Sequence, residues 1–163
     1  MNQLFTMGKK KKKRASRIPY EYKEEEITYV NQSDYQLRVA ESQIHLGGLG
    51  VYAEEDIPEG ALLGYYTGAI RNQGDAPYHP GYAFHLNHQY FIDGFMNPRN
   101  MIAMINDAHR TTFQYNCEFE VFIPEGDLEL SQIHEKMVEV RTIRPIQMGE
   151  ELFISYGDDY WEW

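Results

Sequence analysis

The sequence predicts a mainly β domain with short helices, and three observations lead to this prediction. Apolar and aromatic residues alternate with polar ones in several short runs, which is the period of a half-buried strand. Glycine, proline, asparagine and aspartate separate these runs, as turn residues do. Only one segment has the pattern of a helix, and the length of 163 residues fits one domain with some tail to spare.

Six short runs are expected to form strands. They are Leu37–Val39, Ala61–Tyr66, Tyr82–Leu86, Tyr90–Ile92, Cys117–Ile123 and Met137–Thr142. Asn87-His88 can turn the chain between the third and the fourth run, which predicts a β-hairpin. Pro124 to Asp127 has good turn chemistry and closes the fifth run.

One short helix is expected after Asn97. The side chain of Asn97 suits an N-cap, and Pro98 suits the first helical position, where a missing N–H costs nothing. The apolar body of this helix is predicted over Met101–Ile105.

Charge is distributed unevenly along the chain. Residues 1–23 contain eight of the 15 Lys and Arg residues and a single acidic residue, Glu21. The remainder contains seven basic and 24 acidic residues, a formal balance of −17. A body this acidic should repel nucleic acid and attract basic partners, although acidity also serves solubility alone.

The basic run Lys9–Arg14 is expected to belong to a basic, flexible tail over residues 1–34, with the globular domain over 35–163. Such a run is compatible with a nuclear-localisation signal, with binding to nucleic acid or an anionic membrane, and with a tail that has no specific reader. It is also compatible with a pseudosubstrate that visits the acidic body. The expected location is therefore nuclear, or otherwise cytoplasmic.

Composition argues against several classes of protein. No apolar run approaches the length of a membrane span, and no secretory signal is visible. Cys117 is the single cysteine, so neither a disulfide framework nor a cysteine zinc site is expected. His79, His85, His88 and Asp93 lie close in sequence but lack the spacing of metal ligands, so no metal is expected.

The C-terminal stretch Gly149 to Trp161 (GEELFISYGDDYW) reads as a turn, a short strand, a second turn and an aromatic cluster. Leu152 and Ile154 share one face of the extended part. As a local pattern this is also compatible with an ordinary edge strand bearing surface aromatics. As a motif it resembles the C-terminal signature of the SET-domain protein lysine methyltransferases.

Two further blocks carry the same resemblance. His45 to Ala53 (HLGGLGVYA), followed by Asp56 to Gly60 (DIPEG) and Tyr65 to Gly68 (YYTG), is similar to the opening of the SET domain. Asn97 to Ala108 (NPRNMIAMINDA), with Tyr115 to Phe119 (YNCEF), is similar to the central motif of that family. In this second block Asp107 and Ala108 stand where the family usually has His and Ser. The three blocks follow the family order.

The resemblance implies a SET-domain, β-clip-like fold of small curved sheets with a threaded C-terminal segment. The chain resembles most the compact viral or bacterial stand-alone forms of the family, which have no cysteine-rich zinc module after the domain. It also implies roles for individual residues. Catalysis is expected from Tyr156 and Tyr66. Contacts to the cofactor are expected from Gly48, Leu49, Gly50, Tyr82, Asn106, Asp107 and Trp161, and contacts to the substrate from Tyr66, Ile154 and Tyr160.

The expected activity is methyl transfer from S-adenosyl-L-methionine to a lysine side chain of a basic protein segment, such as a histone tail. One alternative is a catalytically inactive SET-like domain that binds a basic peptide. Another is a basic-tailed nucleic-acid binder, for which the acidic body is poor support. The protein is not expected to associate with a membrane, and its acidic body is not expected to bind nucleic acid directly.

Overall fold

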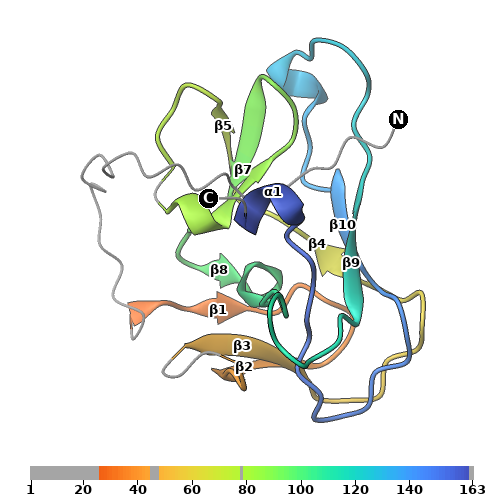
Figure 1. The fold of residues 1–163 in the computed structure, drawn as a ribbon. Helices are drawn as coiled ribbons and strands as arrows, with labels where there is room; N and C mark the ends of the chain where they lie inside the picture. Colours follow the sequence, from red (N-terminus) through yellow and green to blue (C-terminus); the bar gives the residue numbers. More distant parts are fainter. Residues whose placement is uncertain (1–25, 45–47, 78, 162–163) are drawn as a thin grey trace.

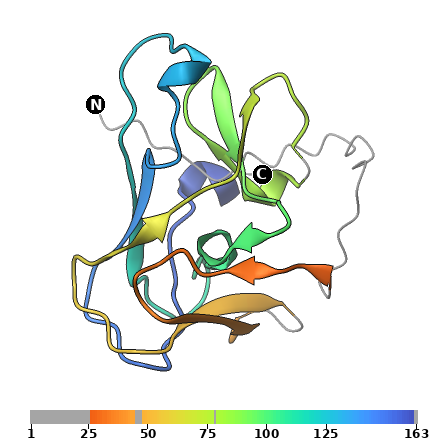
Figure 2. The same ribbon diagram turned by 180° about the vertical axis from the view of Figure 1, so that it is seen from behind.

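The computed structural model describes residues 26–44, 48–77 and 79–161, and these residues form four small sheets. Figures 1 and 2 show the sheets grouped around the short helix η3, with a long C-terminal segment passing through the middle. Two sheets have two strands and two have three. This arrangement of small sheets and short helices confirms the predicted fold class.

Most of the expected runs are strands. The first sheet pairs β2 (Leu37–Glu41) with β3 (Leu49–Ala53) in antiparallel fashion. In the second, β10 (Val138–Thr142) lies between β4 (Leu62–Tyr65) and β9 (Cys117–Val121) and is antiparallel to both. In β10 the alternation in the sequence is matched by burial, since Val138, Val140 and Thr142 are buried and the residues between them are partly exposed.

The predicted hairpin is confirmed. In the third sheet β7 (Tyr90–Asp93) lies between β5 (Ala69–Asn72) and β6 (Ala83–His85). The 3-10 helix η2 (Pro80–Tyr82) leads into β6. The side chain of Asn87 closes the turn between β6 and β7 because its Oδ1 accepts the backbone N–H groups of Gln89 and Tyr90 at 2.8 and 2.9 Å.

The predicted helix exists, but its start was predicted wrongly. Arg99–Asn100 form a short strand, β8, and the helix η3 covers Met101–Met104 with 3-10 geometry. Its N-cap is Asn100, whose Oδ1 accepts the N–H of Ile102 at 3.1 Å, whereas Pro98 follows a cis peptide bond outside the helix. Two asparagines precede the apolar body, and the one adjacent to it caps the helix.

Ordered structure begins before the predicted domain boundary at residue 35. The strand β1 (Tyr29–Val30) runs parallel to β8, and Ile27 is buried. The part of the predicted tail that is described, 26–34, therefore packs on the domain. The basic run Lys9–Arg14 lies outside the described residues, and the extent of a tail stays a prediction.

Residues 151–154 are the threaded segment, and they pair on both sides with parts of the chain far away in sequence. On one side the N–H of Leu152 donates to the carbonyl of Val51 in β3 at 2.7 Å. On the other side the N–H of Ile154 donates to the carbonyl of Asn106 at 2.9 Å, and the carbonyl of Phe153 accepts the N–H of Cys117 at 3.1 Å. The predicted C-terminal strand is thus a run of isolated bridges in the interior of the domain.

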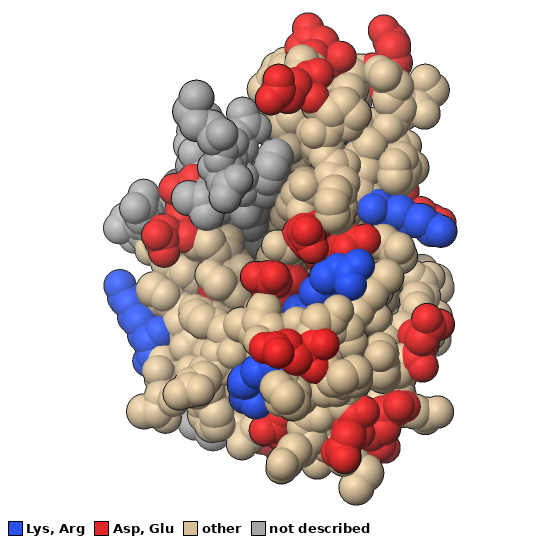
Figure 3. Space-filling model, turned by 90° about the vertical axis from the view of Figure 1, so that its right-hand side faces the viewer, with Lys and Arg blue, Asp and Glu red and all other residues tan. Residues whose placement is uncertain are grey.

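The surface of the domain is predominantly acidic. Figure 3 shows Asp and Glu side chains spread over one face with fewer Lys and Arg among them. Several of the arginines are paired within the domain: the Arg141 Nε atom, for example, lies 2.7 Å from an oxygen of Glu139. The basic side chains are therefore partly neutralised, and the acidic excess faces solvent.

Candidate active site

The glycine stretch 48–50 is fixed by a buried carboxylate from the threaded segment. Glu151 is 2% exposed, and its Oε1 accepts the hydroxyl of Ser42 at 2.7 Å while its Oε2 accepts the N–H of Gln43 at 2.9 Å. A Cβ atom at Gly50 would lie 2.1 Å from this Oε1. Position 50 therefore requires glycine because the Glu151 carboxylate occupies the space that a side chain would need.

Asn106 connects the same stretch to the central motif. Its Nδ2 donates to the carbonyl of Leu49 at 2.8 Å and to the hydroxyl of Ser42 at 3.1 Å. A donor to a backbone carbonyl must be the amide nitrogen, so the orientation of this side chain is determined by its partners. The amide nitrogen holds the glycine stretch, which leaves Oδ1 as the acceptor available to a ligand.

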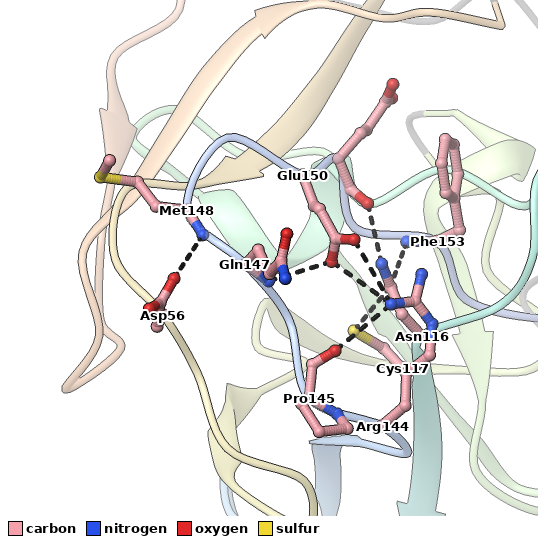
Figure 4. Close-up of polar contacts among 10 residues, drawn as sticks. Asp56, Asn116, Cys117, Arg144, Pro145, Gln147, Met148, Glu150 and Phe153 are labelled. Atoms are coloured by element: carbon pink, nitrogen blue, oxygen red, sulfur yellow. Dashed lines mark hydrogen bonds and ion pairs between the residues drawn. The ribbon is translucent and has the colours of Figure 1, made fainter.

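Asn116 holds the threaded segment in register, as the close-up in Figure 4 shows. This residue is 1% exposed, and its Nδ2 donates to the carbonyl of Glu151 at 2.9 Å. Its Oδ1 accepts the N–H of Phe153 at 2.8 Å. The side chain thus makes both hydrogen bonds of a missing strand neighbour, so the segment is satisfied without a continuous sheet.

The turn before the threaded segment is closed by its own polar groups (Figure 4). Glu150 accepts the N–H of Gln147 at 3.1 Å and lies 3.3 Å from the Arg144 guanidinium. Asp56 accepts the N–H of Met148 at 2.9 Å. These contacts fix the point at which the chain enters the interior.

Tyr156 follows the threaded segment and is anchored at two points. Its hydroxyl donates to the carbonyl of Ile105 at 2.6 Å, and its backbone N–H donates to Oδ2 of Asp107 at 2.8 Å. Burial, together with the nearby Tyr160 and Asp107, raises the pKa of Tyr156 well above its ordinary value of 10.0. The phenol is therefore neutral at physiological pH, and its oxygen lone pairs point away from the Ile105 carbonyl.

Tyr66, like Tyr156, is anchored by a hydrogen bond from its hydroxyl to a backbone carbonyl, but it lies in the buried core. It is fully buried, and its hydroxyl donates to the carbonyl of Tyr82 at 2.5 Å. Burial is the main cause that raises the pKa of Tyr66 well above 10.0. A Cβ atom at Gly94 would lie 2.5 Å from the Tyr66 hydroxyl, so this glycine makes room for the ring.

Tyr160 and Tyr82 complete the aromatic cluster around Tyr156. Tyr160 lies in the short helix α1 (Asp158–Trp161), and its ring meets the Tyr156 ring edge to face at 4.8 Å. Burial raises the pKa of Tyr160, and the neighbouring Tyr82 raises it further. Ile154 is 1% exposed and belongs to the hydrophobic core that lies under this cluster.

Asp107 accepts four hydrogen bonds and is 4% exposed. Its Oδ1 accepts the hydroxyl of Tyr115 at 2.6 Å and the N–H of His109 at 2.8 Å. Its Oδ2 accepts the N–H of Tyr156 and the indole N–H of Trp161, each at 2.8 Å. An ionised carboxylate has about four acceptor sites, and protein donors take all of them here.

Trp161 stacks on His109 with ring centroids 4.9 Å apart and an interplanar angle of 9°. Its indole N–H is taken by Asp107. Both interactions lie inside the protein, so the indole is oriented by its neighbours before any ligand arrives.

The predicted site residues fall into two groups in the structure. The first surrounds the glycine stretch and contains Gly48, Leu49, Gly50 and Asn106. The second surrounds Tyr156 and contains Tyr66, Tyr82, Asp107, Ile154, Tyr160 and Trp161. The threaded segment joins the groups, because Asn106 pairs with Phe153 and precedes Asp107. Which of these residues contact cofactor or substrate stays a prediction.

Three supporting residues were missed in the sequence. Glu151, Asn116 and Ser42 hold the glycine stretch and the threaded segment, as described above. The sequence does give an indication for Glu151. It is the second of two carboxylates directly before an apolar segment, and a carboxylate there is expected to be either exposed or paired. Ser42 has no comparable pattern around it.

The histidines considered as metal ligands have other partners. The His88 Nε2 atom lies 2.7 Å from Asp127, and His85 contacts the amide of Gln73 at 2.9 Å. Over the described ranges, no three His, Cys, Asp or Glu side chains come together as a metal site would require. Within the same ranges, no helix has the length and apolar character needed to cross a membrane.

Comparisons with known proteins agree with this geometry. A model of the SET domain matches residues 48–157. The Caenorhabditis elegans protein named histone-lysine N-methyltransferase set-17 is 30% identical over 126 residues, which cover 76% of this chain and 41% of that protein. The chain therefore spans less than half the length of this curated relative.

Two solved structures have a similar fold. A chain in a humanized mutant of the Chaetomium thermophilum Polycomb Repressive Complex 2 superposes with a TM-score of 0.58 at 25% identity, covering 77% of this chain and 15% of that one. The methyltransferase domain of human PR domain-containing protein 2 superposes with a TM-score of 0.51 at 20% identity, covering 73% and 75%. The match of the SET domain model to residues 48–157, more than half of the chain, shows that the protein belongs to the SET domain family.

Proposed function

We propose that this protein transfers a methyl group from S-adenosyl-L-methionine to a lysine side chain of a basic protein segment. The observation that carries the proposal is the anchored Tyr156, held by Ile105 and Asp107 at the end of the threaded segment. Membership of the SET domain family and 30% identity to a histone-lysine N-methyltransferase support it.

The donor set around the glycine stretch fits the amino-acid end of this cofactor. Oδ1 of Asn106 is an acceptor for an ammonium group, and the buried Glu151 carboxylate adds negative charge beside it. Gly48 has no side chain that could come between its backbone and a ligand. S-adenosyl-L-methionine supplies the electrophilic methyl group when it is bound, and Asn106 and the glycine stretch would hold it.

The tyrosine cluster has the properties needed to bind and orient the amine of a substrate lysine. A lysine with an ordinary pKa near 10.4 must lose its proton before its nitrogen can attack, and an aromatic, desolvated channel favours the neutral amine. Because the Tyr156 hydroxyl donates its hydrogen bond to the Ile105 carbonyl, the phenol oxygen can accept a hydrogen bond from the amine and orient it. A phenol whose pKa is this high serves as an aligning group rather than as a base.

The acidic surface supports a basic substrate. Residues 24–163 contain seven basic and 24 acidic residues, which attract a Lys- and Arg-rich segment and raise its rate of encounter. A histone-like tail has this chemistry, and the curated relative is named for histone lysine. A nuclear location follows from such a substrate and agrees with the basic run Lys9–Arg14.

An inactive SET-like domain is the competing hypothesis. The argument for it is that Asp107 would place a carboxylate near the carboxylate of the cofactor and repel it. The four donors on that carboxylate weaken this argument, because they occupy both oxygens within the protein and disperse the charge over protein groups. The deciding experiment incubates the full chain with radiolabelled S-adenosyl-L-methionine and mixed histones. Labelled lysine in the histones is expected, whereas cofactor binding by calorimetry without any labelled protein would favour the inactive form.

A further inference from the structure

One carboxylate joins three parts of the chain beside the proposed reaction centre. Asp107 lies after η3, and its partners come from the residues next to it, from the loop before β9 and from the C-terminal segment. The two contacts to the C-terminal segment use the same oxygen, Oδ2, which accepts the N–H of Tyr156 and the indole N–H of Trp161 at 2.8 Å. Both ends of the stretch 156–161 are thus fastened to a single atom.

The chemistry of the contacts makes this fastening strong and directional. Four donors match the acceptor capacity of an ionised carboxylate, and a protonated carboxyl group would lose one of them. Hydrogen bonds to a charged acceptor are roughly twice as strong as neutral ones, and burial strengthens them further. Among the described residues, the salt bridges include none to Asp107, so these hydrogen bonds are what holds the carboxylate.

Removal of Oδ2 of Asp107 would break one of the two hydrogen bonds that anchor Tyr156. The Tyr156 hydroxyl would still reach the Ile105 carbonyl, but the backbone N–H would have no acceptor. The ring of Tyr160, which meets the Tyr156 ring at 4.8 Å, lies in α1, and the last residue of α1 is Trp161, which makes the other contact to this oxygen. The orientation of the tyrosine cluster therefore depends on Asp107 although the carboxylate need not touch a substrate.

We infer that Asp107 is a positioning residue: its Oδ2 fastens the Tyr156 backbone and the Trp161 indole to the central turn and thereby aligns the tyrosine cluster. This role differs from the cofactor contact that the motif suggests, because protein donors already fill both oxygens. The kinetic consequence rests on the proposed methyl transfer, whereas the structural consequence does not.

The kinetic test compares Asp107→Asn with Tyr115→Phe. The asparagine keeps the shape but replaces one acceptor by an NH₂ group. The phenylalanine removes one hydrogen bond from the same carboxylate and leaves the contacts of Asp107 to Tyr156 and Trp161 intact. With saturating S-adenosyl-L-methionine and mixed histones, the maximal rate of Asp107→Asn should fall by about tenfold or more, with a cofactor Kd within about threefold of the wild type. Tyr115→Phe should retain a rate within about threefold.

The structural test does not need activity. In a Trp163→Phe background Trp161 is the single tryptophan, so its indole N–H gives one signal in a nitrogen–proton spectrum. The Asp107→Asn substitution should shift this signal upfield and speed hydrogen exchange at the Tyr156 amide by about tenfold or more, since both protons lose a charged acceptor. Tyr115→Phe should leave both signals near their original state.

Several results would overturn the inference. A loss of cofactor affinity with an unchanged maximal rate would make Asp107 a cofactor ligand, and equal losses in Asp107→Asn and Tyr115→Phe would make it a general structural residue. If Asp107→Asn does not fold, Trp161→Phe replaces it: a slower rate and faster exchange at Tyr156 support the inference, and unchanged values overturn it. A wild type without methyl transfer refutes the proposed function, and the exchange experiment then still decides the positioning role.

Discussion

The hydroxyl of Tyr156 donates a 2.6 Å hydrogen bond to the backbone carbonyl of Ile105, across 51 positions of sequence. The carbonyl follows directly after η3, and the tyrosine follows directly after the threaded segment. The bond therefore ties the central motif to the C-terminal motif. It also determines which side of the phenol oxygen remains free to meet an amine.

Tyr156→Phe is expected to reduce methyl transfer by about 100-fold or more, because the oxygen that orients the amine is lost. The unpaired Ile105 carbonyl should cost about 1–3 kcal/mol of stability, so the variant should remain folded. The rate is measured with radiolabelled cofactor on mixed histones. Tyr90→Phe is the matched control, since its hydroxyl also donates to a backbone carbonyl, that of Leu128, and it should keep its activity. A near-normal rate for Tyr156→Phe would refute the assignment.

Asn106→Ala is expected to weaken cofactor binding by about tenfold or more. The variant loses the contact at 2.8 Å to the Leu49 carbonyl as well as the available Oδ1 acceptor, so both the glycine stretch and the ligand contact suffer. Titration calorimetry with S-adenosyl-L-methionine measures the effect. Asn87→Ala serves as the control, because Asn87 closes a hairpin turn through its own side chain. An unchanged Kd for Asn106→Ala would mean that the cofactor binds elsewhere.

Gly50→Ala should lower the free energy of unfolding by about 2 kcal/mol or more, since its Cβ would lie 2.1 Å from a carboxylate oxygen of Glu151. Displacing that carboxylate also breaks its contact with Ser42. Gly74→Ala is the natural comparison, because no atom lies within 4 Å of a Cβ there, and it should be near neutral. Urea unfolding measures both variants, and equal midpoints would contradict the predicted clash.

Stability should fall as the pH rises above 9, in part through Cys117. Burial raises the pKa of its thiol from an ordinary 9.0 to about 12, so in that interval the unfolded chain binds fewer protons than the folded one. The contribution is complete below pH 9 and is lost between pH 9 and 12, with a limiting slope of about 1.4 kcal/mol per pH unit.

The Cys117→Ala variant isolates this contribution. Urea unfolding between pH 8 and 10 should show a shallower loss of stability in the variant than in the wild type. Tyrosine ionisation, including that of Tyr115, whose pKa burial raises to about 12, contributes equally to both proteins and cancels in the comparison. Parallel curves for the two proteins would show that the folded thiol titrates as it does in the unfolded chain.

Much of the fold was predictable because it depends on local patterns. The alternation in Cys117–Val121 and Val138–Thr142 and the turn at Asn87 are properties of a few neighbouring residues. The start of η3 was missed because both Asn97 and Asn100 can cap a helix, and only the tertiary structure decides between them.

The sequence motifs name the residues of the candidate site, whose roles stay predictions, but they do not reveal the contacts among them. The motifs identified Asn106, Asp107 and Tyr156, yet no sequence period reveals that Asp107 would accept four hydrogen bonds from residues up to 54 positions away. The role of Glu151 against Gly50 is likewise a relation across the fold. Such contacts follow from the threading of the C-terminal segment, which composition does not encode.

The threading also sets an order of assembly. Ser42 and Glu151 are partners that lie 109 positions apart, and the glycine stretch at the start of β3 lacks the carboxylate that packs against it until residue 151 is in place. During synthesis on the ribosome, β2 and β3 therefore emerge long before the residues that complete their site. Closing so long a loop is slow and costly in chain entropy. The glycine stretch and the tyrosine cluster should thus mature together in one late step, so that a partly made chain carries neither.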